Sequence, residues 1–366
     1  MHTPFVFGAA VFLASLWLTP IVLTWARRSN IQDLPLPPKK THPAPTPLLG
    51  GVSIFFSILF GFLLFISFSP IPNDVARFIV SISLGMFFLV VFGILDDRYS
   101  LPPHYQILGP LSATFVLIFW GVGQDNITNP LYYIGLSNDP LLHLSVASIS
   151  FLGLKFTFFT DVFTLVWMLM LIYTTKFLDG LNGLVSGITI IGGIMLFITS
   201  IALGQWFVAI LSLITAAAFG GFLPYNLRGK VFLGEAGSTL AGFLLGASAL
   251  IGPAKISLTF LILGIPILDA LWVIYERMVK AKKSPFRGDL RHLHFKLVER
   301  GYTSRQTVMI LWFISFAFGV LGLFMQGLAR GVLVIAVIIL MIMLLHYATN
   351  KNSKSEIRNN FQNPND

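Results

Sequence analysis

Residues 184–203 read LVSGITIIGGIMLFITSIAL, an unbroken run without a charged side chain. An α-helix needs about 20 predominantly apolar residues to cross a hydrocarbon core of about 30 Å. The run therefore predicts a membrane-spanning helix. The rest of the sequence can be interpreted outward from it.

Similar runs recur along almost the whole chain of 366 residues, of which 55% are hydrophobic and 11% are charged. The mean hydropathy is +0.82, whereas soluble domains carry about 25% charged residues. We expect an all-α polytopic membrane protein with about eleven transmembrane helices. One transmembrane domain is predicted over 1–350, followed by a polar C-terminal tail over 351–366. The predicted spans are 4–25, 48–69, 75–95, 106–122, 162–178, 184–203, 206–223, 237–254, 257–279, 306–327 and 329–348.

Lysine and arginine are divided unevenly between the loops that these spans create. With the N-terminus outside, most of them fall in the loops 26–47, 96–105, 179–183, 224–236 and 280–305 and in the tail. The other side keeps Arg77, Lys155, Lys255 and Arg330. Because basic loops face the cytoplasm, we expect a multi-pass protein of the cytoplasmic membrane with a cytoplasmic C-terminus. Loops that fix the orientation also account for the net charge of +9, so nucleic acid is not expected as a partner.

The apolar stretch 141–160 is ambiguous between a span and a pair of strands. Lys155 interrupts it, and its β-branched and aromatic residues, such as Val146, Ile149 and Phe156, are typical of strands. A span here would also put the loop of Asp96 on the opposite side from the later polar loops. We therefore expect an external hairpin or a re-entrant piece near 123–160.

Two adjacent carboxylates, Asp96 and Asp97, follow the third span directly. Such a pair repels itself unless a cation relieves it. It can therefore bind a divalent metal, or keep one carboxylate basic enough to accept a proton. A solvated helix end that pairs with Arg98 explains the same residues.

The segment 179–183, with the sequence DGLNG, forms a short turn after Lys176. Its glycines allow a tight turn and a close approach to a ligand. Asp179 and Asn182 can accept N–H groups of a base or hold a metal-bound water. The alternative is an ordinary turn in which Asp179 caps the next helix.

The segment 234–238, with the sequence GEAGS, opens a later span after Asn226, Arg228 and Lys230. Glycines at a helix N-terminus with basic residues upstream suit a phosphate. Mg²⁺ would allow Glu235 to lie beside it, since this ion binds one or two carboxylates together with phosphate oxygens. The alternative is that Glu235 only favours the helix N-terminus electrostatically.

His292 and His294 lie two positions apart in the largest cytoplasmic loop, a spacing that puts both on one face of a strand or extended loop. With Arg287, Arg291 and Lys296 they form an anion-binding patch. A basic loop that only fixes orientation is the alternative for the cations. Zinc is weakly supported in a chain that has no cysteine.

Asp269 lies deep inside an apolar run, three residues after Pro266. Ionisable groups in a membrane span face the protein interior or a polar cavity, so a functional role is the default expectation. Pro266 is expected to kink this ninth helix. Lys40, ahead of Gly50 and Gly51, is a further candidate for a phosphate contact.

Together these motifs resemble the polyprenyl-phosphate N-acetylhexosamine-1-phosphate transferases, a membrane superfamily that includes the muramoyl-pentapeptide phosphotransferase of peptidoglycan synthesis. The resemblance runs from Thr46 to about Gly301. Pro266 and Asp269 also match a Pro-x-x-Asp of the family. The segments that carry the resemblance are TPLLGG (46–51), LDDR (95–98), DGLNGL (179–184), FLGEAGS (232–238) and DLRHLH (289–294).

The resemblance implies that a polyprenyl phosphate attacks the sugar-linked phosphorus of a UDP-sugar in the bilayer and that UMP leaves, as the first membrane step of a cell-envelope glycan. It implies a catalytic role for Asp96 or Asp97. Mg²⁺, with Mn²⁺ as the alternative, is expected at Glu235 and Asp179. The oligomeric state is left open, a homodimer included. The substrate-binding candidates are Lys40, Lys176, Asn182, Asn226, Asp269, Arg291, His292 and His294.

Three positions depart from the family pattern, which usually has Asn at Lys176, Asp at Asn182 and Asp at Glu235. We hypothesise that Lys176 supplies a phosphate contact, or that the sugar nucleotide differs. The string HLHFK at 292–296 is closer to the N-acetylglucosamine-1-phosphate branch than to the muramoyl branch and favours UDP-N-acetylglucosamine. The alternatives are the muramoyl-pentapeptide enzyme, a transporter or flippase with the same fold, and a non-catalytic relative.

Overall fold

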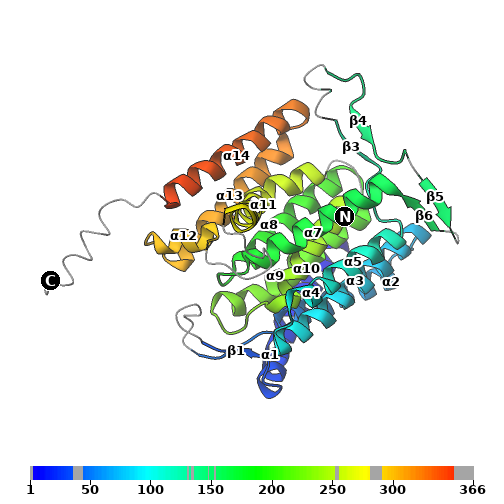
Figure 1. Cartoon of the computed structure of the whole chain (residues 1–366). Coiled ribbons are helices and arrows are strands. Elements are labelled where there is room, and N and C mark those ends of the chain that lie inside the picture. Colours follow the sequence, from blue (N-terminus) through cyan, green and yellow to red (C-terminus); the bar gives the residue numbers. More distant parts are fainter. Residues whose placement is uncertain are drawn as a thin grey trace.

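The chain folds into a bundle of long helices, seen in a computed structural model (Figure 1). The structure describes residues 3–35, 44–129, 132, 136–146, 148–151, 154–251, 255–280 and 291–349. Lys40, Arg287 and the tail 351–366 lie outside the described residues, so the predictions for them stay predictions.

The helices alternate with short connections along almost the whole described chain. They are α1 (Thr3–Arg28), α2 (Gly50–Phe68), α3 (Asn73–Tyr99), α4 (Pro103–Gln106), α5 (Leu108–Phe119), α7 (Phe158–Leu178), α8 (Leu184–Ala202), α9 (Trp206–Leu227), α10 (Gly234–Leu250), α11 (Ile256–Tyr275), α12 (Leu293–Glu299), α13 (Ser304–Phe324) and α14 (Gly327–Thr349). A π-helical turn, η1 (Glu276–Lys280), continues α11.

Within the described residues, nine of these helices are long and apolar enough to cross a membrane. Each of the predicted spans overlaps a helix, but α5 has 12 residues and α10 has 17, so these two are shorter than expected. The polytopic helical class is therefore confirmed. The predicted number of spans and their orientation stay predictions. Helix α11 includes Pro266, and its expected kink also stays a prediction.

The ambiguous stretch between α5 and α7 forms two antiparallel strand pairs, as its composition predicts. Strand β3 (Asn126–Thr128) pairs with β4 (Leu141–His143), and β5 (Ser148–Phe151) pairs with β6 (Leu154–Thr157). Both hairpins lie at one end of the bundle, and α12 lies at the opposite end (Figure 1). At the same end as α12, β1 (Gln32–Asp33) pairs with β2 (Thr46–Pro47).

Helix α10 lies at the centre of the bundle and packs against α2, α3, α7, α8, α9 and α11. All of its residues except Glu235 are buried. Glycine, alanine and serine make up much of its sequence, and such small side chains let neighbouring backbones approach closely. A Cβ on Gly51 of α2 or on Gly93 of α3 would overlap the α10 backbone at Gly237 and Ala236. These glycines bring the ends of α2 and α3 to the first turn of α10.

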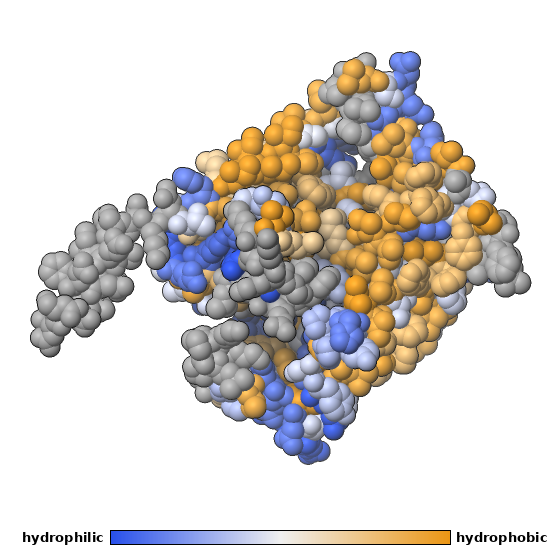
Figure 2. Space-filling model, viewed as in Figure 1, coloured by the Kyte–Doolittle hydropathy of each residue, from blue (hydrophilic) through white to orange (hydrophobic). Residues whose placement is uncertain are grey.

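The surface of the bundle shows how it meets its surroundings. Hydrophobic residues form a broad band across the middle of the visible face, and hydrophilic residues gather toward the two ends (Figure 2). Large apolar side chains on this surface, such as Trp17, Phe313 and Ile342, are more than half exposed. Such a band fits a helical bundle that is surrounded by lipid.

Candidate functional site

The paired aspartates lie in the last turn of α3 and have different partners. Both carboxylate oxygens of Asp97 accept the backbone N–H of Glu235, at 3.0 and 3.2 Å. Asp96 accepts the N–H of Leu101 at 2.7 Å and the amide of Gln106 at 3.1 Å. Asp97 therefore binds the N-terminus of α10, where a helix leaves its N–H groups unpaired and favours negative charge.

Gly234 allows Asp97 to come this close. Its φ is +69°, in the left-handed region, which residues other than glycine adopt only at a cost in free energy. A Cβ at this position would overlap the carboxylate of Asp97. The glycines of segment 234–238 thus have a packing reason that the sequence analysis did not anticipate.

Glu235 forms an ion pair with Lys176 of α7. Its Oε1 lies 2.5 Å from the lysine Nζ, and the side chains are 16% and 13% exposed, respectively. The same ammonium donates to Oε1 of Gln106 at 3.0 Å. A continuous set of polar contacts therefore runs from Asp96 through Gln106 and Lys176 to Glu235.

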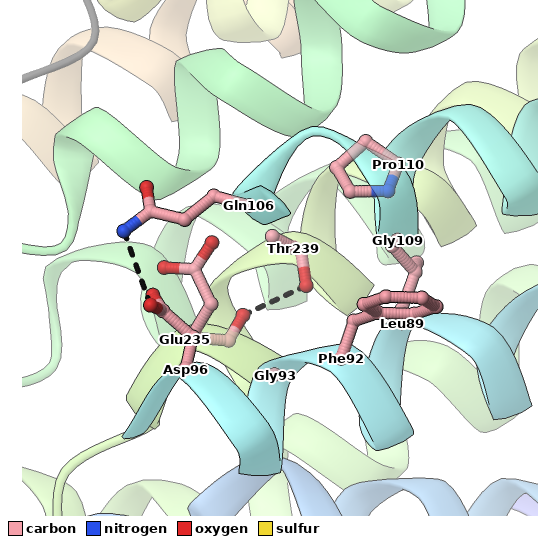
Figure 3. Close-up of a pocket in the computed structure, with 9 residues that line it drawn as sticks. All are labelled: Leu89, Phe92, Gly93, Asp96, Gln106, Gly109, Pro110, Glu235 and Thr239. Atoms are coloured by element: carbon pink, nitrogen blue, oxygen red, sulfur yellow. Dashed lines mark hydrogen bonds between the residues drawn. The ribbon is translucent and has the colours of Figure 1, made fainter. Parts of the chain in front are cut away.

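Three of these side chains, Asp96, Gln106 and Glu235, border a pocket between α3, α4, α5 and α10 (Figure 3). Asp96, Gln106 and Glu235 lie at its polar end, and Leu89, Phe92 and Pro110 line the apolar remainder. Sequence analysis did not single out Gln106, because a lone glutamine after a loop carries no distinctive pattern. Its importance follows only from the two contacts that it makes.

Asp179 follows α7 and lies beside the same acidic residues. Burial, and next the negative charge of Glu235, raise the pKa of its carboxyl group to about 7. The alternative in which Asp179 caps the next helix is wrong, because the N-cap of α8 is Gly183 and no side chain caps it. Gly183, at φ +84°, instead donates its N–H to Asn226 at 2.9 Å.

Asn226 and Asn182 lie near each other but differ in their surroundings. Asn226 is buried, and its amide also binds Ser186 and the carbonyl of Val231. These internal hydrogen bonds join α9 to the turn before α8 and to the segment before α10. Asn182 is exposed in that turn. A substrate contact of either residue stays a prediction.

The histidine pair lies where α12 begins. Nδ1 of His292 lies 2.8 Å from Oδ2 of Asp269, and the N–H of Leu293 donates to Oδ1 of the same carboxylate at 2.9 Å. The expected extended loop is wrong from Leu293 onward, because α12 begins there. Asp269, only 4% exposed, thus faces the protein interior as predicted, and it holds the start of α12 against α11.

The two imidazole rings are nearly parallel, with centroids 5.6 Å apart and planes 6° from each other. The ring of His292 also stacks with Phe177, at 5.8 Å. His294 is buried against Gly180, where a Cβ would overlap its Nε2. Burial lowers the pKa of His294 to about 3. Arg291, exposed, directly precedes the pair.

The last turn of α7 and the turn after it connect the two halves of the site. Lys176 contacts Glu235, its neighbour Phe177 stacks on His292, and Gly180 lies against His294. The structure therefore brings Asp96, Asp97, Asp179, Glu235 and the histidines to one end of the bundle, as the sequence predicts. The end formed by the strand pairs is the opposite one.

The carboxylates fit a metal ion only in part. Among the described residues, no group of three His, Asp or Glu side chains is arranged to hold a metal. The acids that lie together, Glu235 and Asp179, would supply one or two carboxylates, and Mg²⁺ commonly takes its other ligands from substrate phosphates and water. The residues present thus fit a metal that completes its set of ligands with water or with substrate oxygens.

Comparison with known proteins gives one match to a family model and several similar proteins. Residues 79–253 match glycosyl transferase family 4. A probable undecaprenyl-phosphate N-acetylglucosaminyl 1-phosphate transferase of Bacillus subtilis is 27% identical, over 86% of this chain and 83% of the relative. An undecaprenyl-phosphate alpha-N-acetylglucosaminyl 1-phosphate transferase of Thermotoga maritima is 29% identical, over 85% and 87%. A phospho-N-acetylmuramoyl-pentapeptide-transferase of Staphylococcus aureus is 24% identical, over 87% and 98%.

Proposed function

We propose that this chain, which is similar to polyprenyl-phosphate N-acetylglucosaminyl 1-phosphate transferases, transfers N-acetylglucosamine 1-phosphate from UDP-N-acetylglucosamine to undecaprenyl phosphate. The observation that carries the proposal is the contact between three distant segments. Asp97 of α3, Lys176 of α7 and Glu235 of α10 meet at one end of an apolar bundle. A charged site at the end of such a bundle suits an acceptor whose tail stays in lipid while its phosphate reaches the interface.

The reaction exchanges one phosphoanhydride bond for another. A phosphate oxygen of the lipid forms a bond to the sugar-linked phosphorus of the donor. The bond from that phosphorus to the bridging oxygen breaks, and UMP leaves with the electron pair. Such transfers depend on positioning and on neutralised charge more than on covalent help from the protein.

The geometry supports different roles for the two aspartates. Asp97 is held by the N-terminus of α10, whereas Asp96 borders the pocket with the apolar wall. We assign Asp96 to the acceptor phosphate, as the proton acceptor or the carboxylate nearest to it. Asp97 then positions Glu235.

Glu235 and Asp179 are the residues that would hold Mg²⁺, with Mn²⁺ as the alternative. A bound ion of this kind supplies positive charge to the diphosphate oxygens. His292, with Nδ1 directed at Asp269, presents its other ring nitrogen as a partner for a phosphate or nucleotide group. Asp269 acts through His292 and does not itself contact substrate.

The proposed location is the cytoplasmic membrane, with this site on the cytoplasmic face. The distribution of lysine and arginine supports it. Arg291, which directly precedes the histidines, is exposed at the end of the bundle that holds the site.

The test is UMP release by the purified protein, with undecaprenyl phosphate and several UDP-sugars, with and without Mg²⁺. We expect Mg²⁺-dependent release with UDP-N-acetylglucosamine and at least about a hundredfold loss in Asp96→Asn. Release only with UDP-N-acetylmuramoyl-pentapeptide would favour the activity of the Staphylococcus aureus relative. Release with no donor would contradict the proposal and favour a transporter, flippase or non-catalytic relative.

A further inference from the structure

Lys176 lies beside acidic residues, and its positive charge is not part of the family pattern that this sequence resembles. That family usually has Asn at this position. Here the ammonium is within 2.5 Å of Glu235 and 3.0 Å of Gln106. It also lies 5.6 Å from the centre of the Tyr173 ring. A carboxylate, an amide and an aromatic ring therefore hold this ammonium at the end of α7.

We propose that Lys176 is a tethered cation that pairs with Glu235 whenever no divalent cation is bound to this carboxylate, and that it moves to the donor diphosphate when such a cation binds. The proposal rests on the proposed function for the identity of the diphosphate. Its first half, the occupation of Glu235, concerns the protein and the cation alone.

Competition follows from the geometry of the carboxylate. Mg²⁺ requires ligand oxygens at about 2.0–2.1 Å, and the ammonium of Lys176, 2.5 Å from Oε1 of Glu235, competes for that oxygen. Two cations at such close range also repel each other, and more strongly in a partly buried site than in water. The ion pair, with side chains 13% and 16% exposed, is shielded from the solvent that weakens surface pairs.

Gln106 defines where the released ammonium can go. Its Oε1 accepts from Lys176 while its amide donates to Asp96. A lysine that leaves Glu235 but keeps this contact stays within reach of the pocket bordered by Asp96. The long, flexible lysine side chain suits such a short movement. Lys176, which stands where the similar family usually has Asn, would thus make the binding of the metal cation and the binding of the sugar-nucleotide donor depend on one side chain.

The test measures cation affinity without any nucleotide. Mn²⁺ is titrated into the purified protein, and free Mn²⁺ is followed by electron paramagnetic resonance. The variant Lys176→Met removes the charge at similar length. We expect it to bind Mn²⁺ at least about tenfold more tightly than the unaltered protein, because Glu235 is released. Arg305→Gln, which removes an exposed charge from the first turn of α13, is the charge-matched control and should leave the affinity unchanged.

Equal Mn²⁺ affinity in Lys176→Met and the unaltered protein overturns the proposal, and so does the absence of measurable binding in both. Lys176→Asn gives the same comparison if the Met variant does not fold, and Lys176→Arg should retain the weak affinity. The second half is measured as binding of UDP-N-acetylglucosamine in the presence of Mn²⁺. We expect at least about tenfold weaker donor binding in Lys176→Met.

Failure of the proposed function is a separate outcome. If the unaltered protein releases UMP from no donor but Lys176→Met binds Mn²⁺ more tightly, the tethered cation is supported and the transferase proposal is wrong. If the unaltered protein releases UMP but Lys176→Met binds Mn²⁺ with the same affinity, the transferase proposal is supported and the tethered cation is wrong.

Discussion

Gly234 shows how one residue can determine whether a charged site forms. Its left-handed backbone and the missing Cβ allow the carboxylate of Asp97 to reach the N–H of Glu235. From sequence alone, the first glycine of a Gly-acid-x-Gly motif suggests a phosphate-binding site. In the structure, this glycine is required because the end of α3 approaches it closely. The sequence contains the residue, but the partner that requires it lies 137 positions earlier, at Asp97.

We predict that Gly234→Ala abolishes UMP release. The left-handed conformation costs about 1–2 kcal/mol for a residue with a Cβ, and the new methyl group displaces Asp97 in addition. Gly204 provides a matched control, because it has the same φ of +69° and open space where a Cβ would lie. Gly204→Ala should lose stability in a thermal melt and keep its activity. Equal activity loss in both variants would show that backbone strain alone is responsible.

His294 should make the stability of the protein depend on pH. Burial lowers its pKa to about 3 in the folded protein, whereas an exposed histidine has a pKa of about 6.5. Below pH 6.5 the unfolded chain therefore binds a proton that the folded chain does not, and stability falls as pH falls. From pH 6.5 to 5 the loss is about 2 kcal/mol.

The measurement is a set of unfolding curves in detergent between pH 7.5 and 5, a range chosen to bracket the ordinary histidine pKa of about 6.5. In His294→Gln the acid-induced loss should be smaller, whatever the absolute stability of the variant. A slope identical to that of the unaltered protein would mean that His294 is protonated equally in both states.

At the scale of elements, the positions of the long helices follow from the sequence because lipid demands continuous apolar runs. The elements that hydropathy does not control were harder to predict. The segment after His292 is helix α12 and not an extended loop, because it is fixed by the carboxylate of Asp269 on another helix. The break at Ile107 between α4 and α5 also has no hydropathy pattern.

Asp269 should act on the reaction only through α12 and His292. In Asp269→Asn the amide oxygen can still accept the N–H of Leu293. In that orientation the amide NH₂ group faces Nδ1 of His292, where the carboxylate offered a hydrogen-bond acceptor. We expect at least about a tenfold fall in the rate of UMP release and a shifted pH profile, because the imidazole loses its fixed proton.

The matched control is Asp161→Asn at the other end of α7, where the carboxylate accepts the N–H of Thr157 at 2.8 Å. It also removes one carboxylate hydrogen bond but lies on the hairpin side, so it should leave the pH profile unchanged. A change in stability with an unaltered pH profile in Asp269→Asn would assign this residue a structural role only.

At the scale of the whole molecule, the sequence predicts the convergence of the site better than its internal contacts. The distribution of basic loops places Asp97, Glu235 and His292 on one side, and the structure brings them together. The pairing of Lys176 with Glu235 and the role of Gln106 depend on how α4, α7 and α10 pack. A single sequence does not contain that information in any local pattern.

The predicted orientation can be measured directly, because the chain has no cysteine. Val146→Cys lies in an exposed turn between the two strand pairs, and Arg305→Cys lies in the exposed first turn of α13. A membrane-impermeant maleimide should label the first in intact cells and the second only after permeabilisation. The unaltered chain, which has no thiol, gives the background. The reverse labelling pattern would invert the topology and place the site outside.

The burial of α10 has a consequence for how the protein is made. A segment of 17 residues rich in glycine, alanine and serine gains little from entering lipid alone. Its insertion should therefore depend on α7 and α3 already being in the bilayer as docking partners. Glu235 reaches Lys176 only after this late step, so a half-assembled chain is expected to stay inactive during biogenesis.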